Sequence, residues 1–318
     1  MIILGGTSNE PLVEEICKFL DEPVGKVYHH TFPSGEKYCQ IQQNIRGEDV
    51  YIVQSMNYPV NDNLMELLVM IDAVRRASPR RITAVIPYMG YLRQDRKTKS
   101  RTPISGRLVA DMIEATGVDR VIGMDFHCAQ AQGFFSIPVD HLYATPVICD
   151  FVNGDVDTIV SPDVGGIKRA HAFAETMGVD FAFIAKKRLS DTEVEISEVS
   201  GDVKGKRVLI VDDMTESAGT LIAAANACRE AGAEYIRCAV THGVFTPVAR
   251  ERLSAYNEID EFIYTNTAQN DMLEDGPILA DNVMTERKCL SVAPLFAKAI
   301  KRSNTNESVS ELFKVDGF

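Results

Sequence analysis

Short apolar runs rich in β-branched residues alternate along this chain with segments of helical periodicity. Between many of these runs, apolar residues recur at i, i+3 and i+4, as at Leu64, Leu67, Leu68 and Ile71. This alternation is typical of mainly parallel sheets flanked by helices, and it predicts an α/β fold. The runs that fit strands are Ile2–Leu4, Val50–Gln54, Ile82–Ile86, Val121–Met124, Thr158–Val160, Phe181–Ile184, Val208–Val211, Ile236–Thr241 and Glu261–Thr265.

The chain is long enough for two domains. Its 318 residues are about twice the usual domain length of roughly 150 residues. Glu114–Met124 and Glu230–Ala239 each run from a helix end through a glycine into a strand, which is a weak internal repeat. Because the helical periodicity breaks near Pro146 and Asn153-Gly154, we predict two similar domains over residues 1–147 and 148–304. The remaining tail, 305–318, is expected to pack back on the first domain.

Charge and cysteine content exclude several classes of protein. There are 33 Lys plus Arg against 45 Asp plus Glu, giving a net charge of −12, which argues against a general surface for nucleic acid or anionic membrane. Seven cysteines without CxxC spacing fit reduced thiols in a cytosolic protein. The chain begins with a strand-like Met1–Leu4 and has no apolar run approaching about 18 residues. We therefore expect a cytoplasmic protein that is neither secreted nor inserted in a membrane.

The stretch Arg207–Leu221, RVLIVDDMTESAGTL, places two acids directly after a buried strand. Ligands of α/β proteins gather at the carboxyl ends of strands, so Asp212 and Asp213 are expected at a binding edge. The hydroxyl-rich turn Thr215–Thr220 then begins a helix, whose N–H groups are suited to bind a phosphate. Together these features suit a sugar phosphate. The alternative is an ordinary helix cap flanked by solvated acids.

Two further groups of cations stand out in this acidic chain. Arg93–Arg101 holds five cations within nine residues, which suits an anionic ligand, although a solvated loop is the alternative. Lys186 and Arg188 follow the strand Phe181–Ile184, and strand alternation places them on one side with Lys187 on the other. The alternative for Lys186, Lys187 and Arg188 is that all three are solvated cations on a connecting loop.

These motifs together resemble a known family. Arg207–Leu221 resembles the phosphoribosyl-diphosphate (PRPP) motif shared by type I phosphoribosyltransferases and ribose-phosphate diphosphokinases. Other segments, spread from end to end of the chain, resemble the diphosphokinases, of the phosphate-activated class I type. They are Phe32–Glu36, Arg93–Lys97, Ser100–Ser105, Asp125–Phe135, Ser161–Arg169, Lys186–Arg188 and Asn306–Phe313.

The resemblance implies a fold, a reaction and partners. The fold would be two similar phosphoribosyltransferase-like domains, the N-terminal one on the ATP side and the C-terminal one on the ribose 5-phosphate side. The reaction would transfer the β,γ-diphosphoryl group of ATP to the C1 hydroxyl of ribose 5-phosphate, giving PRPP and AMP for nucleotide biosynthesis, with Mg²⁺ as the cofactor. Family members are commonly homohexamers built from dimers.

The resemblance also assigns site residues. Lys186 and Arg188 would be catalytic, and His127 and Asp163 would bind the metal. Ser34, Glu216 and Ser217 differ from the residue that is commonest in the family at their positions. ATP would be bound by Phe32, Ser34, Glu36, Arg93 and Gln94, without a P-loop. Ribose 5-phosphate would be bound by Asp212, Asp213, Thr215, Glu216, Ser217, Ala218, Gly219 and Thr220.

Three other functions are compatible with parts of the sequence. A phosphoribosyltransferase that consumes PRPP would share Asp212–Thr220 but would not need the nucleotide segments around Phe32 and Arg93. A catalytically silent regulatory relative would share the fold, but the presence of Lys186 and Asp163 argues against it. A transcription regulator built on this fold would need a basic face or a helix-turn-helix, and neither is visible.

Overall fold

The computed structural model describes residues 1–188, 195–269, 278–280 and 283–313, and within these it leaves out the side chains of 186–188, 195–197, 278–280, 283–285, 311 and 313. The chain forms two compact units. The first contains Met1–Tyr143, Thr267–Gln269 and the described chain from Ser291. The second contains Ala144–Asn266 and the described residues from 278 to Leu290.

The first unit is built on a five-stranded sheet with the order β1-β4-β5-β6-β7. Every neighbouring pair in it is parallel, so the five carboxyl ends lie at one edge. A parallel sheet is covered on both faces, which accounts for the burial of every residue of β4. The strands are β1 (Ile2–Gly5), β4 (Asp49–Val53), β5 (Arg81–Ile86), β6 (Arg120–Met124) and β7 (Val139–Leu142).

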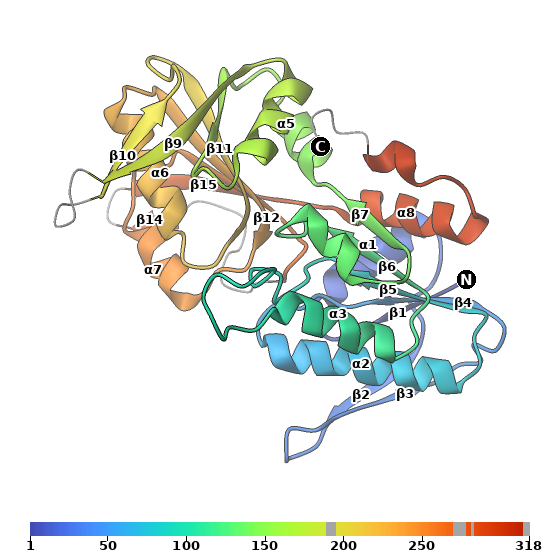
Figure 1. The fold of residues 1–318 in the computed structure, drawn as a ribbon. Coiled ribbons are helices and arrows are strands. Elements are labelled where there is room, and N and C mark those ends of the chain that lie inside the picture. The colour runs from blue at the N-terminus through green and yellow to red at the C-terminus, as the bar shows by residue number, and fades with distance from the viewer. Residues whose placement is uncertain (189–194, 270–277, 281–282, 314–318) are drawn as a thin grey trace. The chain divides into compact units, whose positions relative to one another are not determined.

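Helices cover the two faces of this sheet (Figure 1). α2 and α3 share a hydrophobic core with Leu4, Val50 and Ile52, which point to one face of the sheet. α1 and α8 pack against each other on the opposite face. The helices of this unit are α1 (Glu10–Leu20), α2 (Val60–Arg76), α3 (Ser105–Ala115) and α8 (Ala293–Thr305), with the short 3-10 helices η1 (Ala129–Phe134) and η2 (Ser310–Phe313).

A two-stranded hairpin projects from the first unit, below the sheet in Figure 1. β2 (Val27–Thr31) pairs antiparallel with β3 (Lys37–Ile41), and the turn between them is Phe32–Glu36. The sequence predicted this turn but not the two strands beside it. Polar residues and histidines interrupt the apolar periodicity there, because most of the hairpin is exposed.

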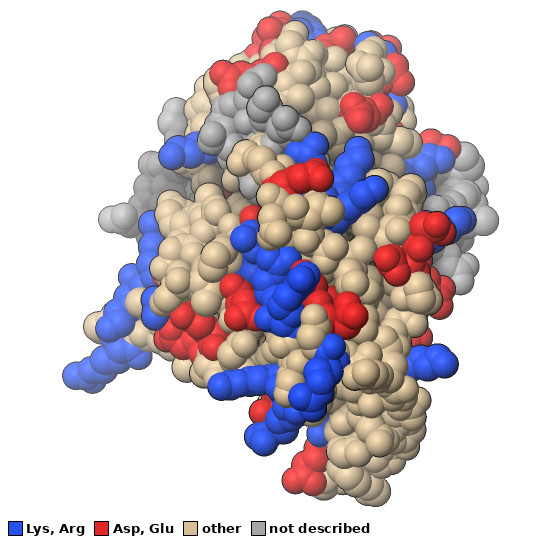
Figure 2. All heavy atoms as spheres, turned by 90° about the vertical axis from the view of Figure 1, so that its right-hand side faces the viewer, with Lys and Arg blue, Asp and Glu red and all other residues tan. Residues whose placement is uncertain are grey.

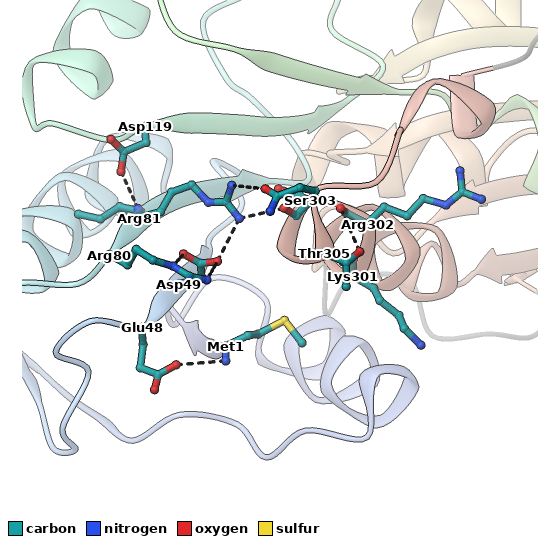
Figure 3. Close-up of polar contacts among 12 residues, drawn as sticks. Met1, Glu48, Asp49, Arg80, Arg81, Asp119, Lys301, Arg302, Ser303 and Thr305 are labelled. Atoms are coloured by element: carbon teal, nitrogen blue, oxygen red, sulfur yellow. Dashed lines mark hydrogen bonds and ion pairs between the residues drawn. The ribbon is translucent and has the colours of Figure 1, made fainter.

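α8 lies in the first unit, although the predicted domain ranges assigned it to the second. Arg81, at the start of β5, holds it there: Nη2 donates to the carbonyl of Ser303 at 2.8 Å and to Oδ2 of Asp49 at 3.1 Å (Figure 3). Arg80 also donates to Asp49, and this hydrogen bond, helped by the charge of Arg81, holds the pKa of Asp49 below its usual range. Periodicity alone cannot predict such a long-range return of the chain.

The second unit is built on an eight-stranded sheet with the order β10-β9-β8-β11-β12-β13-β15-β14. The two edge pairs, β9 with β10 and β14 with β15, are antiparallel, and the other pairs are parallel. The strands are β8 (Thr158–Ser161), β9 (Asp180–Arg188), β10 (Glu195–Ser200), β11 (Arg207–Thr215), β12 (Tyr235–Gly243), β13 (Glu261–Thr265), β14 (Ile278–Ala280) and β15 (Val283–Leu290). The helices are α4 (Thr145–Val152), α5 (Ile167–Met177), α6 (Gly219–Glu230) and α7 (Pro247–Ser254).

The two units share a core arrangement. The parallel run β4-β5-β6-β7 in the first corresponds to β8-β11-β12-β13 in the second. α3 connects β5 to β6, as α6 connects β11 to β12. The weak internal repeat predicted from sequence falls at these equivalent helix-to-strand connections. The prediction of two similar α/β halves is therefore confirmed.

The surface carries both signs of charge. On the face drawn in Figure 2, groups of Lys and Arg lie among groups of Asp and Glu. This fits a chain that has 33 Lys plus Arg and 45 Asp plus Glu. Among the described residues, no helix is long and apolar enough to cross a membrane. All seven cysteines are free thiols, and those that are buried are Cys17, Cys39, Cys149, Cys228 and Cys238.

Candidate active site

The acid pair lies near the carboxyl end of β11, in the middle of the second sheet. The strand continues to Thr215, so Asp212 and Asp213 belong to it instead of following it at Val211 as predicted. Nη1 of Arg169, from the first turn of α5, lies 3.1 Å from Oδ1 of each acid. Burial, with a contribution from the neighbouring Asp213, raises the pKa of Asp212 to about 8, while Arg169 opposes the shift.

The turn after β11 has a rigid backbone. Thr215 Oγ1 accepts a hydrogen bond from the amide of Ala218 at 3.1 Å, and Ala218 has the left-handed φ of 57°. The carbonyl of Glu216 accepts from the Thr246 amide at 2.7 Å, and that of Ser217 accepts from Arg252 at 3.2 Å. These bonds fix the N-terminus of α6, where helix N–H groups form a site suited to a phosphate.

A second turn lies after the neighbouring strand β8. Oδ1 of Asp163 accepts from the amide of Gly166 at 2.9 Å, and the carbonyl of Asp163 accepts from Ser161 Oγ at 2.7 Å. A Cβ at Gly166 would lie 2.8 Å from Ser161 Oγ, so a larger residue there would require that hydroxyl to shift. The turn leads directly into α5, which carries Arg169 to the acid pair. Asp163, Asp212 and Asp213 thus come from one edge of one sheet.

The two predicted catalytic cations lie on the next strand of the same sheet. Lys186 and Arg188 are the final part of β9, which pairs parallel with β8 and antiparallel with β10, where Ser197 faces Lys186 and Glu195 faces Arg188. Their carboxyl-end position matches that of the acid pair. Their side chains lie outside the described part of the structure.

In the first unit, Phe32, Ser34 and Glu36 form the exposed tip of the hairpin. The Phe32 amide donates to the carbonyl of Glu36 at 2.9 Å, and Ser34 Oγ donates to Glu36 Oε2 at 2.9 Å. Gly35 permits the turn with a φ of 92°. The Phe32 ring is 44% exposed and meets the ring of His30 edge-on at 4.9 Å. An exposed aromatic ring at a tip is suited to stack on a flat ligand.

Arg93 and Gln94 lie in the loop that follows β5. Both are exposed, as is most of the basic run to Arg101. Gln94 is tied to the start of α3, because its Oε1 accepts from Ser105 Oγ at 2.7 Å and its carbonyl accepts from the Gly106 amide at 3.2 Å. The structure therefore anchors one end of the basic run to the start of α3, in the connection from β5 to β6.

His127 lies in the tight turn after β6, where its side chain is exposed. No group of three or more His, Cys, Asp or Glu side chains suited to a metal occurs among the described residues. Mg²⁺ commonly uses only one or two protein carboxylates together with waters and substrate phosphates. Asp163, with Oδ1 engaged by Gly166 and Oδ2 on an accessible turn, fits such a role better than the imidazole of His127.

Arg169 is the site residue that sequence reasoning assigned to no role. The family resemblance covers it only as the last residue of the segment Ser161–Arg169. Its position relative to Asp163 could have indicated a role. Asp163 lies in the turn after a central strand, and Arg169 lies on the first turn of the helix that follows, from which a long side chain can reach the neighbouring strand. The pairing of β8 with β11 is needed to identify that neighbour.

Comparison with known proteins decides the family. Residues 1–117 match the profile of the N-terminal domain of ribose phosphate pyrophosphokinase, and residues 145–269 match that of the phosphoribosyl transferase domain. The ribose-phosphate pyrophosphokinase of Rhodopirellula baltica is 46% identical, over 98% of both chains. The chain belongs to the ribose-phosphate pyrophosphokinase family.

Other ribose-phosphate pyrophosphokinases agree. That of Synechococcus elongatus is 45% identical over 98% of this chain and 93% of its own. The crystal structure of phosphoribosylpyrophosphate synthetase from Mycobacterium smegmatis superposes with a TM-score of 0.85 at 38% identity, over 96% of this chain and 99% of that one. The fold class of two phosphoribosyltransferase-like domains and the enzyme class predicted from sequence are confirmed. The N-terminal match distinguishes this family from a simple phosphoribosyltransferase.

Proposed function

We propose that this enzyme transfers the β,γ-diphosphoryl group of ATP to the C1 hydroxyl of ribose 5-phosphate, giving PRPP and AMP. The observation that carries the proposal is the acid pair Asp212 and Asp213 beside the anchored N-terminus of α6, within a chain similar from end to end to ribose-phosphate pyrophosphokinases. Carboxylates can accept hydrogen bonds from the sugar hydroxyls, and the amides of a helix N-terminus can bind the phosphate. The two features together fit the two ends of ribose 5-phosphate.

The turn Thr215–Thr220 holds the 5-phosphate in this proposal. Thr215, Glu216, Ser217, Ala218, Gly219 and Thr220 provide amides and hydroxyls around it. The carbonyls of Glu216 and Ser217 accept from Thr246 and Arg252, and the Ala218 amide donates to Thr215 Oγ1, so the amides at the start of α6, from Gly219 on, are the ones that meet the ligand in this proposal. Asp212 and Asp213 accept hydrogen bonds from the ribose hydroxyls, and their carboxylates become the favoured form as the sugar and cations approach.

ATP is held by the first unit. The Phe32 ring stacks on the adenine, and Ser34 and Glu36 form hydrogen bonds with the polar edge of the base. Arg93 and Gln94 contact the phosphates. Mg²⁺ would be held by Asp163 and His127 with the phosphates, and when bound it neutralises charge on the diphosphoryl oxygens. The exposure of Phe32 and Arg93 supports these roles, because both side chains are accessible to a ligand.

Catalysis in this proposal is electrostatic. Diphosphoryl transfer spreads negative charge over the equatorial oxygens, so alignment and cations lower the barrier and no nucleophilic side chain is required. Lys186 and Arg188 supply that positive charge. Their strand position, at the same sheet edge as the acid pair, supports this assignment.

Assembly and cell compartment remain predictions from the sequence and its family resemblance. We propose a homo-oligomer, a hexamer built from dimers, acting in the cytoplasm on small molecules, with no role in nucleic-acid or membrane binding. The competing proposal is a catalytically silent regulatory subunit. Such a subunit would only bind partner synthetase subunits and would turn over no substrate.

The deciding experiment is phosphorus NMR of the purified protein with ATP, Mg²⁺ and ribose 5-phosphate. AMP and PRPP should appear together and in equal amounts. A matched sample of Asp213→Asn should bind less ribose 5-phosphate and form less PRPP. ADP with a phosphorylated sugar would indicate transfer of a single phosphoryl group, and absence of any product would favour the silent subunit.

A further inference from the structure

We propose that His141 is a positioning residue that holds the turn Asp125–His127 in place through the backbone amide of Phe126. His141 is on β7, only 5% exposed. Its Nε2 lies 2.8 Å from the Phe126 nitrogen. One residue earlier, the amide of Asp125 donates to the carbonyl of Leu142, also on β7, at 2.9 Å. Successive amides of the turn are thus bonded to successive residues of the neighbouring strand.

The bond to Phe126 specifies the tautomer of His141. A backbone amide can only donate, so Nε2 must be the unprotonated, accepting nitrogen, and the proton of the neutral ring is on Nδ1. The amide of Gln132 lies 3.2 Å from Nδ1. Gln132 Nε2 also donates to the carbonyl of Ala129 at 3.0 Å, which sets the orientation of that amide, so its approach to a protonated Nδ1 is a contact between two donors and not a hydrogen bond.

The turn needs this support because its own conformation is strained. Asp125 has a φ of 38°, a left-handed value that is unfavourable for a residue with a side chain. The Phe126 ring folds back over Gly123, where a Cβ would lie only 2.3 Å from it. On its other side the ring stacks on His141 with centroids 4.7 Å apart. His141 therefore supports Phe126 twice, through its ring and through its acceptor nitrogen.

The position of His127 follows from that of Phe126, since the two are adjacent in the chain. His127 is the exposed end of the turn, and its predicted role in binding Mg²⁺ depends on where the turn places it. This last step rests on the proposed function. The link between His141 and the turn does not, because it concerns the protein alone.

Two substitutions separate the acceptor from the ring. His141→Phe keeps a ring to stack on Phe126 but has no acceptor nitrogen. His141→Gln loses the ring but places an amide oxygen within reach of the Phe126 amide, at about the position of Nε2. Nitrogen-15 NMR of the histidine rings reports the tautomer directly. Hydrogen exchange of the Phe126 amide reports whether its bond is intact, and neither measurement needs substrate or metal.

We expect an Nδ1–H ring at His141 and a slowly exchanging Phe126 amide. Exchange should be faster by about tenfold in His141→Phe, and His141→Gln should restore most of the protection. In the active enzyme, His141→Phe should raise the Mg²⁺ concentration for half-maximal rate by about tenfold, as for residues that orient a metal-binding side chain, with the KM for ribose 5-phosphate unchanged.

An Nε2–H ring, or equal exchange at Phe126 in wild type and His141→Phe, would overturn the proposal. If wild type makes no PRPP, the proposed function fails, yet the tautomer and exchange measurements still decide the role of His141. If both measurements agree with our expectation but the Mg²⁺ dependence is unchanged, His141 holds the turn, and the step from the turn to the metal is overturned.

Discussion

Nη1 of Arg169 lies 3.1 Å from Oδ1 of Asp212. The same nitrogen is equally close to Asp213, so a single cation serves two adjacent acids. The Asp213 side chain is only 4% exposed and that of Asp212 19%. Burial and the neighbouring Asp213 outweigh the opposing charge of Arg169, so they raise the pKa of Asp212 and favour a proton on it.

This arrangement predicts how stability depends on pH. Asp212 has its pKa raised by burial from 3.8 to about 8, so between those values the folded protein binds a proton that the unfolded chain has released. Stability from this group is therefore present at low pH and lost as the pH rises toward 8. Compared with Asp212→Asn, the wild-type free energy of unfolding should fall by about 1 kcal/mol or more from pH 5 to pH 8.5. Denaturant unfolding without substrates tests this, and a constant difference between the two proteins would contradict it.

Thr220→Val should raise the KM for ribose 5-phosphate far more than that for ATP. Thr220 is exposed on the first turn of α6, so the change should not disturb packing. A lost hydrogen bond to a charged phosphate costs about 1–3 kcal/mol of binding. Steady-state kinetics with each substrate varied in turn gives the comparison. Equal effects on both substrates would remove this residue from the phosphate site.

Arg93→Ala should weaken ATP binding and leave ribose 5-phosphate binding nearly unchanged. The matched control is Lys97→Ala, which removes one cation from the same exposed run. Calorimetric titration with a non-hydrolysable ATP analogue distinguishes a specific contact from general charge attraction. If the two variants lose affinity equally, the basic run acts only through its net charge.

Lys186→Ala should lower kcat by roughly a hundredfold or more, since a preorganised charge stabilises the transition state more than either substrate. Both substrates should still bind within about threefold. Lys187→Ala is the control, because strand periodicity predicts a different direction for it and the charge change is the same. Single-turnover kinetics measures the step directly, and equal losses from the two lysines would assign catalysis to other groups.

Arg81→Met should destabilise the first unit by about 1–3 kcal/mol, because it removes the donors to Asp49 and to the Ser303 carbonyl but keeps an apolar stem. Arg76→Met provides the control, since the exposed pair of Arg76 with Asp72 on α2 should contribute little. Hydrogen exchange along α8 would show where the loss falls. Uniform exchange changes across both units would contradict a local role.

The central strands could be predicted from sequence because they are buried and therefore consist of continuous apolar runs. β4, β5, β6 and β11 all start within one residue of their predicted position. The hairpin β2–β3 could not be predicted, since apart from the buried Cys39 its strand residues are exposed or only partly buried. Apolar periodicity reports burial, and it reports exposed strands poorly.

The candidate site divides in the same way. Asp163 and the segment Asp212–Thr220 could be found because they lie at or just beyond the carboxyl ends of strong strands, and the site assignments themselves remain predictions. Arg169 and His141 could not be found, because each acts on a residue of a neighbouring strand. Which strands are neighbours is a property of the sheet order, and no local pattern encodes it.

The packing of α8 on α1 has a consequence for synthesis on the ribosome. α1 ends at Leu20 and α8 begins at Ala293. The ribosome must therefore add roughly 270 residues after α1, which takes about 15–50 s at typical elongation rates, before α8 is made. The first unit begins first and is completed last. A nascent chain stalled anywhere before residue 293 would therefore carry α1 with its α8-facing side uncovered, whatever the state of the segments made in between.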